Sequence, residues 1–70
     1  MDIERCYRIL QISETSSNED ISRSFKKMAM IYHPDKNPRR REWANEQMAI
    51  LNNAYSAVMS YRFSRESAEA

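Results

Sequence analysis

Two stretches with the periodicity of an amphipathic helix, separated by a short segment that contains both prolines, constrain the fold of this chain more than any other feature. The first stretch runs from Asn18 to about Tyr32, and the second runs from about Arg41 to Met59. Helices joined by so short a connection must bury their apolar stripes against each other. The sequence therefore predicts an antiparallel two-helix hairpin.

The apolar residues of each stretch fall on one face of its helix. The first stripe is formed by Ile21, Phe25, Met28 and Tyr32, and the second by Trp43, Ala44, Met48, Leu51, Ala54, Tyr55 and Val58. A shorter amphipathic segment, residues 3–10, is expected to form an N-terminal helix packed on the hairpin. The chain has no glycine and shows no strand signal, so we expect one all-α domain over residues 1–70.

Local chemistry predicts where the first long helix begins and ends. Ser17 is placed to cap its N-terminus, with Asp20 three residues later as a weak capping box. Pro34 ends it, because proline lacks the N–H for the next backbone bond and disfavours helical geometry at His33. The loop that follows comprises residues 33–40.

Two helix boundaries stay open at this level. Asn37 is able to cap the second long helix with Pro38 in its first turn, which would start that helix before Arg41. Residues 61–68 are compatible either with a short fourth helix or with a frayed extension of the preceding one. Neither proline nor glycine separates them from that helix.

Cysteine and glycine usage argue against several kinds of active site. Cys6 is the only cysteine and His33 the only histidine, so the chain has neither an internal disulfide nor a zinc site. Cys6 lies among apolar residues and is better explained as a buried thiol than as a nucleophile. Without glycine there is no phosphate-binding loop. We expect no enzymatic activity, no cofactor and no metal.

Hydropathy argues against a membrane role. The longest apolar run, Met28 to Tyr32, is far shorter than the roughly 20 residues of a membrane-spanning helix. The N-terminal segment is too charged for a signal peptide. We expect a monomeric domain in the cytoplasm or nucleus that has no membrane partner.

The loop sequence His33, Pro34, Asp35 and Lys36 allows two interpretations. In one, His33 and Asp35 only satisfy backbone groups at a helix end. In the other, the loop presents an imidazole, a carboxylate and an ammonium group in a fixed arrangement to a binding partner. We favour recognition, because helices and prolines hold the loop at both ends and preorganised groups lose little entropy on docking.

Three cations, Arg23, Lys26 and Lys27, lie opposite the apolar stripe of the first long helix. Alone, they would be an ordinary solvated face. Beside the loop, they favour steering onto an acidic patch of a partner. The carboxylate of Asp35 is then best suited to accept a charge-assisted hydrogen bond from a partner arginine.

These residues carry a resemblance to the J-domain, the module of DnaJ-type co-chaperones. The segment YRILQI at residues 7–12 resembles the family's Tyr-x-x-Leu-Gly-Val. The segment ISRSFKKMAMIYHPDKN at residues 21–37 resembles its second helix and signature loop. The segment LNNAYSAVM at residues 51–59 is similar to its Ile-x-x-Ala-Tyr-x-x-Leu region. The resemblance covers essentially the whole chain.

The resemblance implies a co-chaperone that docks on a seventy-kilodalton heat-shock chaperone in its ATP-bound state, stimulates its ATP hydrolysis and promotes client capture. The catalytic site would belong to the partner. Carried onto matching positions, the docking residues are His33, Pro34, Asp35, Arg23, Phe25, Lys26, Lys27 and Asn37, and the loop argument adds Lys36.

The sequence departs from the family pattern at three positions, one of which is Ala68, where a tyrosine is common. Gln11 stands where the family usually has glycine, which is expected to affect how the chain leaves the first helix but not the docking face. Met48 stands where a core phenylalanine is usual. Phe25 lies at the edge of the apolar stripe, where both a core role and a docking role fit.

Two rival functions remain. Arg39, Arg40 and Arg41 with Trp43 suggest a nucleic-acid module, since clustered cations bind phosphates and an aromatic ring stacks on bases. The net charge of only +1 and the lack of a groove-reading helix argue against it, and a solvated loop with Trp43 covering the helix pair is the simpler interpretation. The second rival is a J-like module that binds without activating an ATPase, which the intact His33, Pro34 and Asp35 argue against.

Overall fold

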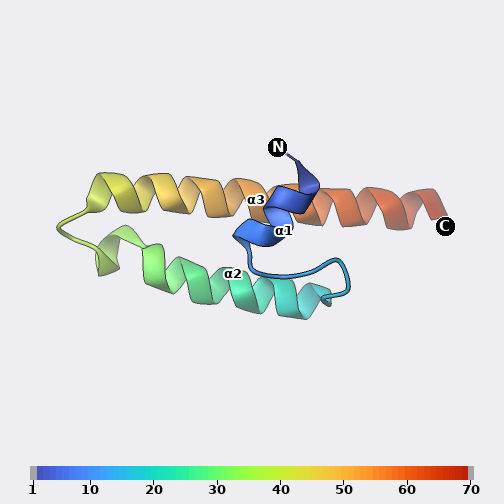
Figure 1. Cartoon of the computed structure of the whole chain (residues 1–70), viewed down its shortest axis with the longest axis horizontal. Helices are drawn as coiled ribbons and strands as arrows, with labels where there is room; N and C mark the ends of the chain where they lie inside the picture. Colours follow the sequence, from blue (N-terminus) through green and yellow to red (C-terminus); the bar gives the residue numbers. More distant parts are fainter. Residues whose placement is uncertain (1, 70) are drawn as a thin grey trace.

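The computed structural model describes residues 2–69, with side chains for residues 2–65. The elements are α1 (Ile3–Ile9), α2 (Asn18–Tyr32), the single-turn 3-10 helix η1 (Pro34–Lys36) and α3 (Arg41–Glu69). α2 and α3 lie side by side in opposite directions, and α1 packs across α3 (Figure 1). The prediction of an all-α hairpin with a short N-terminal helix is confirmed.

α2 spans the residues that its cap and its proline predict. Ser17 has extended backbone geometry, and its Oγ accepts a hydrogen bond from the N–H of Asp20 at 3.1 Å. This satisfies one of the donors that a helix N-terminus leaves unpaired. At the other end, His33 is extended (φ −63°, ψ 140°), because Pro34 follows it. The chain therefore turns a corner at His33.

The start of α3 excludes the earlier boundary that the sequence left open. The helix begins at Arg41, and Asn37 and Pro38 lie in the preceding loop. Asn37 does not cap α3, because its side-chain amide donates hydrogen bonds to carbonyls at the end of α2.

α3 ends later than the sequence predicted, because it extends beyond the expected boundary at Met59. The helix continues without interruption to Glu69, so residues 61–68 form no separate fourth helix. The segment contains no residue that breaks a helix, and Arg62 anchors it to the rest of the molecule. One long helix thus replaces the expected helix and its uncertain tail.

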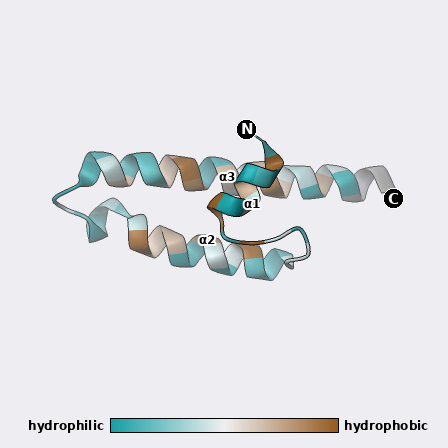
Figure 2. Cartoon of the chain, viewed as in Figure 1, coloured by the Kyte–Doolittle hydropathy of each residue, from teal (hydrophilic) through white to brown (hydrophobic). Residues whose placement is uncertain are grey.

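The core lies where the three helices meet. Its buried residues are Cys6, Tyr7, Leu10, Ile21, Met28, Leu51, Ala54 and Val58. Hydrophobic residues recur along α2 and α3 with polar residues between them (Figure 2), and Cys6 is fully buried, as the sequence predicted. Met48, at the position where the family has a core phenylalanine, is only half-buried and packs at the edge of this cluster. Each large aliphatic residue so buried contributes about 1.5–3 kcal/mol of hydrophobic stabilisation.

Gln11 adopts the left-handed conformation that glycine usually takes after a helix. Its φ is 56°, the only positive φ among the described residues. The N–H of Gln11 donates to the carbonyl of Arg8 and the N–H of Ile12 to that of Tyr7, each at 3.0 Å. These two bonds define a Schellman motif at the end of α1. The exit from the helix therefore keeps the glycine-type geometry, contrary to the expectation drawn from Gln11.

Candidate functional site

The corner between α2 and η1 holds the residues of the predicted recognition loop in one compact turn. Pro34 occupies the first position of η1, where a missing N–H costs nothing. The N–H of Asp35 donates to Nδ1 of His33 at 3.1 Å, and the N–H of Lys36 donates to the His33 carbonyl at 2.9 Å. His33 therefore caps the turn with both its side chain and its backbone.

Two groups of Asp35 lie close to Nδ1 of His33. The backbone N–H of Asp35 donates to Nδ1, so this ring nitrogen is the acceptor in the turn. Nδ1 also lies 3.7 Å from a carboxylate oxygen of Asp35, a contact that becomes an ion pair only when His33 is protonated. The contact at 3.1 Å is the hydrogen bond, because 3.7 Å is too long for one.

Asp35 points its carboxylate into solvent. Its side chain is 81% exposed, against 50% for that of His33. Within the described part of the chain, no N–H or O–H group donates to this carboxylate. The interpretation that the loop residues only satisfy backbone groups at a helix end therefore holds for His33. It gives the carboxylate of Asp35 no role within the domain.

Asn37 fastens the loop to the end of α2. Its Nδ2 donates to the carbonyl oxygens of Ile31 and His33, both at 2.9 Å. The last carbonyls of a helix have no partner within it, so this side chain supplies one. Of the roles expected for Asn37, the structure excludes the cap of α3, and it adds that this side chain positions the corner.

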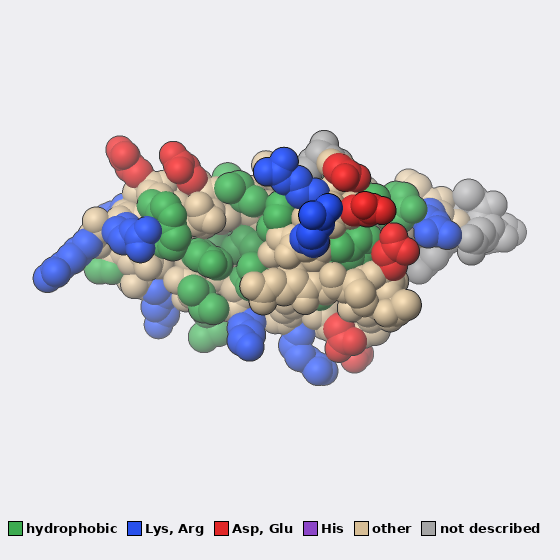
Figure 3. Space-filling view, viewed as in Figure 1, with side chains coloured by type: hydrophobic (Ala, Val, Ile, Leu, Met, Phe, Trp, Pro, Cys, Tyr) green, Lys and Arg blue, Asp and Glu red, His purple; other side chains and the backbone are tan. Residues whose placement is uncertain are grey.

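Arg23, Lys26 and Lys27 project from the exposed side of α2, and all three are exposed. In the space-filling view, Lys and Arg side chains line the edge formed by α2 and the end of the molecule near the loop (Figure 3). Phe25 is half-buried between the two long helices, and its ring stacks on that of Tyr55 at 4.5 Å. The structure therefore places Phe25 in the seam of the hairpin.

Met30 is a residue that sequence reasoning missed. Its side chain is 67% exposed, and together with Ala29, His33, Asp35 and Lys36 it lines a shallow hollow of about 230 Å³. Met30 belongs to the apolar run Met28–Tyr32 but lies off the core stripe. That mismatch is the signal that would have identified it as a surface residue.

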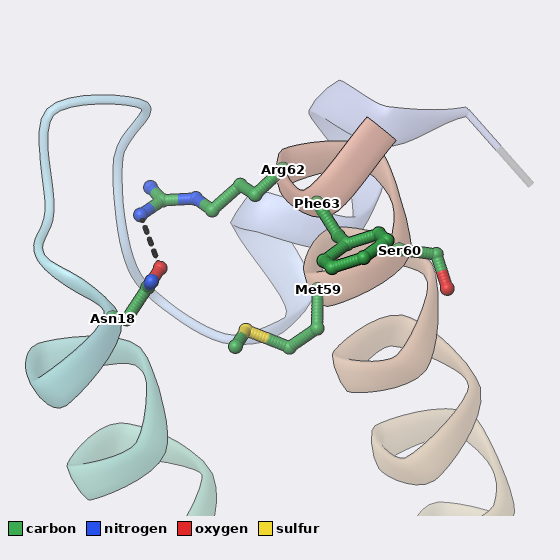
Figure 4. A pocket seen from close by; sticks show the side chains of 5 residues that line it. All are labelled: Asn18, Met59, Ser60, Arg62 and Phe63. Atoms are coloured by element: carbon green, nitrogen blue, oxygen red, sulfur yellow. Dashed lines mark hydrogen bonds between the residues drawn. The ribbon is translucent and has the colours of Figure 1, made fainter. Parts of the chain in front are cut away.

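A second hollow, at the other end of the hairpin, is structural. Asn18, Met59, Ser60, Arg62 and Phe63 line it (Figure 4). Arg62 donates to Oδ1 of Asn18 at 2.9 Å, to the Tyr7 hydroxyl at 3.2 Å and to the Glu14 carbonyl at 3.2 Å. The guanidinium group is committed to holding three segments together.

Trp43 is already engaged within the molecule. The guanidinium of Arg40 lies 3.8 Å from the indole ring centroid, and the ring of Tyr32 lies 5.5 Å away. A base would have to displace Arg40 in order to stack there. This geometry weakens the nucleic-acid interpretation.

A polar corner held by hydrogen bonds thus lies beside an exposed basic helix on a small all-α scaffold. Among known families, the model of the DnaJ domain matches residues 5–67. The chain belongs to the DnaJ-domain family.

Similar curated proteins are also named as DnaJ proteins. The chain is 49% identical over 52 residues to DnaJ protein ERDJ3B of Oryza sativa subsp. japonica, 44% to Chaperone protein DnaJ of Campylobacter lari and 35% to DnaJ homolog subfamily B member 8 of Homo sapiens. Each match covers 74% of this chain, and 15%, 14% and 22% of the respective relative. The chain thus spans less than a quarter of the length of these relatives. No solved structure matches it.

These findings support a co-chaperone module. In the part of the chain that the structure describes, no helix is both long and apolar enough to cross a bilayer.

Proposed function

We propose that this domain docks on a seventy-kilodalton heat-shock chaperone and accelerates the partner's ATP hydrolysis, without contributing a catalytic group of its own. The observation that carries the proposal is the carboxylate of Asp35, which is 81% exposed yet belongs to a turn fixed by His33. An exposed carboxylate on a turn whose backbone is held by hydrogen bonds is suited to a partner that offers a complementary cation.

Docking would proceed in two stages. The cations of α2 steer the domain toward an acidic patch, which raises the association rate more than the affinity. Asp35 then accepts a charge-assisted hydrogen bond from a partner arginine, worth about 1.5–3 kcal/mol. Pro34, Lys36 and the exposed side chain of Met30 complete the contact surface around it.

The role of His33 in this proposal follows from its hydrogen bond. By accepting from the N–H of Asp35, the imidazole holds the carboxylate-bearing residue in its turn. The side-chain amide of Asn37 in turn donates a hydrogen bond to the carbonyl of His33 and so holds His33 in place. Both interactions are present before the partner arrives, so little conformational entropy is lost on docking.

The test is single-turnover ATP hydrolysis by a compatible heat-shock chaperone with the wild-type domain, Asp35→Asn and His33→Gln. We expect the wild type to accelerate hydrolysis and both variants to abolish the effect, with unchanged circular dichroism. Glu46→Gln is the matched control, because it removes one exposed carboxylate from α3 and should retain full stimulation. Stimulation that survives both loop substitutions would contradict the proposal.

The same assay separates the second candidate, a J-like module that binds without activating an ATPase. Its supporting observation is that the loop is held by interactions within the domain, which serve binding alone equally well. Asp35-dependent binding of the wild type to the chaperone, with no change in hydrolysis, would favour this candidate.

A further inference from the structure

The loop between η1 and α3 carries three consecutive arginines, Arg39, Arg40 and Arg41, which the proposed docking surface does not use. We call them the loop arginines. All three are exposed, and among the described residues no carboxylate lies within ion-pair distance of any of them. Among the described residues, these three neighbouring cations therefore have no carboxylate partner, and the guanidinium of Arg40 lies on the ring of Trp43.

Their position is electrostatically unfavourable for the fold. They precede or begin α3, where the partial positive charge of the helix N-terminus repels cations, and Glu42 is the only acidic residue of the first turn. The loop arginines thus oppose the stability of the helix that they introduce. Local conflicts of this kind are expected where residues serve a function.

The structure ties the loop arginines to the recognition loop. The N–H of Arg40 donates to the carbonyl of Asn37 at 3.0 Å, and its guanidinium lies on Trp43, which in turn contacts Tyr32 at the end of α2. The segment following Lys36 is therefore held at both ends. Figure 3 shows Lys and Arg side chains at this end of the molecule as well as along the edge formed by α2.

We propose that the loop arginines are a second cationic contact, for a carboxylate-bearing surface of the same chaperone, and that they add to partner selectivity. This inference rests on the proposed function. It follows from continuity, because Arg39 comes three residues after Lys36 and extends the cationic surface around the His33–Asp35 corner. Arginine suits such a contact, since its guanidinium binds carboxylates through two parallel hydrogen bonds.

A protein partner fits these observations better than a nucleic acid does. The indole of Trp43 carries Arg40 and contacts Tyr32, so it is not a free stacking platform. The other exposed cations near the loop belong to α2, which is part of the proposed protein-docking surface. One acidic partner surface therefore satisfies both cationic groups.

The test compares two double variants with the same change in charge. Arg39→Gln/Arg41→Gln removes two loop arginines and keeps Arg40 on Trp43. Arg5→Gln/Arg8→Gln is the matched control, because it removes two exposed cations from α1, away from the loop. The probe is an ATP-bound heat-shock chaperone whose ATPase the wild-type domain stimulates in an Asp35-dependent manner.

The measured quantity is the association rate constant at low and high salt. At about 50 mM salt, we expect the loop variant to associate about three- to ten-fold more slowly than wild type and the control to stay within about twofold. At about 500 mM salt the difference should largely disappear, because screening shortens the range of surface charges. The melting temperature of the loop variant should equal or exceed that of wild type, since the substitutions relieve repulsion at the start of α3.

The outcomes separate this inference from the proposal on which it rests. If the loop variant associates like the control while Asp35→Asn abolishes stimulation, the inference is wrong and the proposed function stands. If no chaperone responds to the wild-type domain, both fail. If the loop substitutions leave chaperone binding intact but abolish retention on a single-stranded oligonucleotide, the inference is overturned in favour of nucleic-acid binding.

Discussion

His33 and Asn37 hold the corner between α2 and η1 by different means. His33 accepts a hydrogen bond from the next turn through its ring nitrogen, and Asn37 donates two hydrogen bonds back to α2. Together they satisfy backbone groups that a helix followed by proline would leave unpaired. The backbone of Asp35 owes its position in the turn to these two side chains.

Replacing Asn37 should loosen this corner without unfolding the hairpin. Asn37→Ala removes two hydrogen bonds to carbonyl oxygens from a half-buried side chain, so we expect a loss of about 1 kcal/mol and a fall in melting temperature of about 4–8 °C. Amide hydrogen exchange at Asp35 and Lys36 should accelerate. Asn45→Ala, on the exposed face of α3, is the control, and equal effects of the two substitutions would refute the positioning role of Asn37.

A substitution at Gln11, in contrast, is expected to raise the stability of the domain. A residue with a Cβ is strained at φ 56°, whereas glycine is not, so Gln11→Gly should stabilise the domain by about 1 kcal/mol. The same substitution at Gln47, inside α3, should destabilise it by about 1 kcal/mol, because glycine is a poor helix former. Urea unfolding measures both. Destabilisation at both positions would show that the conformation of Gln11 carries no cost.

At the scale of elements, α3 is the scaffold on which the other helices are assembled. Its first half pairs with α2, and its extension beyond Met59 reaches the chain between α1 and α2 through Arg62. The guanidinium contacts α1 at Tyr7, the connecting loop at Glu14 and the start of α2 at Asn18. One side chain thus joins three neighbouring segments that all lie far from it in the sequence.

Arg62→Gln should therefore destabilise the domain although it lies in the tail of a helix. We expect a loss of about 1–2 kcal/mol, because the shorter side chain cannot reach all three acceptors. Amide exchange should accelerate in the α1–α2 connection and leave the His33–Asp35 corner unchanged. Arg5→Gln, which removes an exposed cation from α1, is the control. An Arg62 variant as stable as the Arg5 variant would contradict this role.

At the scale of the whole molecule, the core and the proposed docking loop are separated. The buried cluster is made of side chains from α1, α2 and α3, while the loop and its cations lie at the surface of one end. A chain of 70 residues has a small core and marginal stability. Keeping the recognition residues out of the core allows them to be substituted without loss of the fold.

Much of this organisation follows from local rules and was accessible from the sequence. Helical periodicity, the cap at Ser17 and the proline at position 34 depend on neighbouring residues, so they predicted the hairpin and the place of its corner. The same applies to the buried Cys6 and the exposed cations of α2. The resemblance of segments 7–12, 21–37 and 51–59 to the J-domain then predicted the family, which the match over residues 5–67 shows.

Other features depend on contacts between residues distant in the chain. No periodicity predicts that Arg62 bridges α1, the loop and α2, which is why the tail was left between a fourth helix and an extension. The amide of Asn37 is different, because its acceptors at His33 and Ile31 are only four and six residues away, yet helical periodicity does not identify them. Local propensity determines which segments become helices. The choice of partner for a long polar side chain such as that of Arg62 is made only when those helices meet.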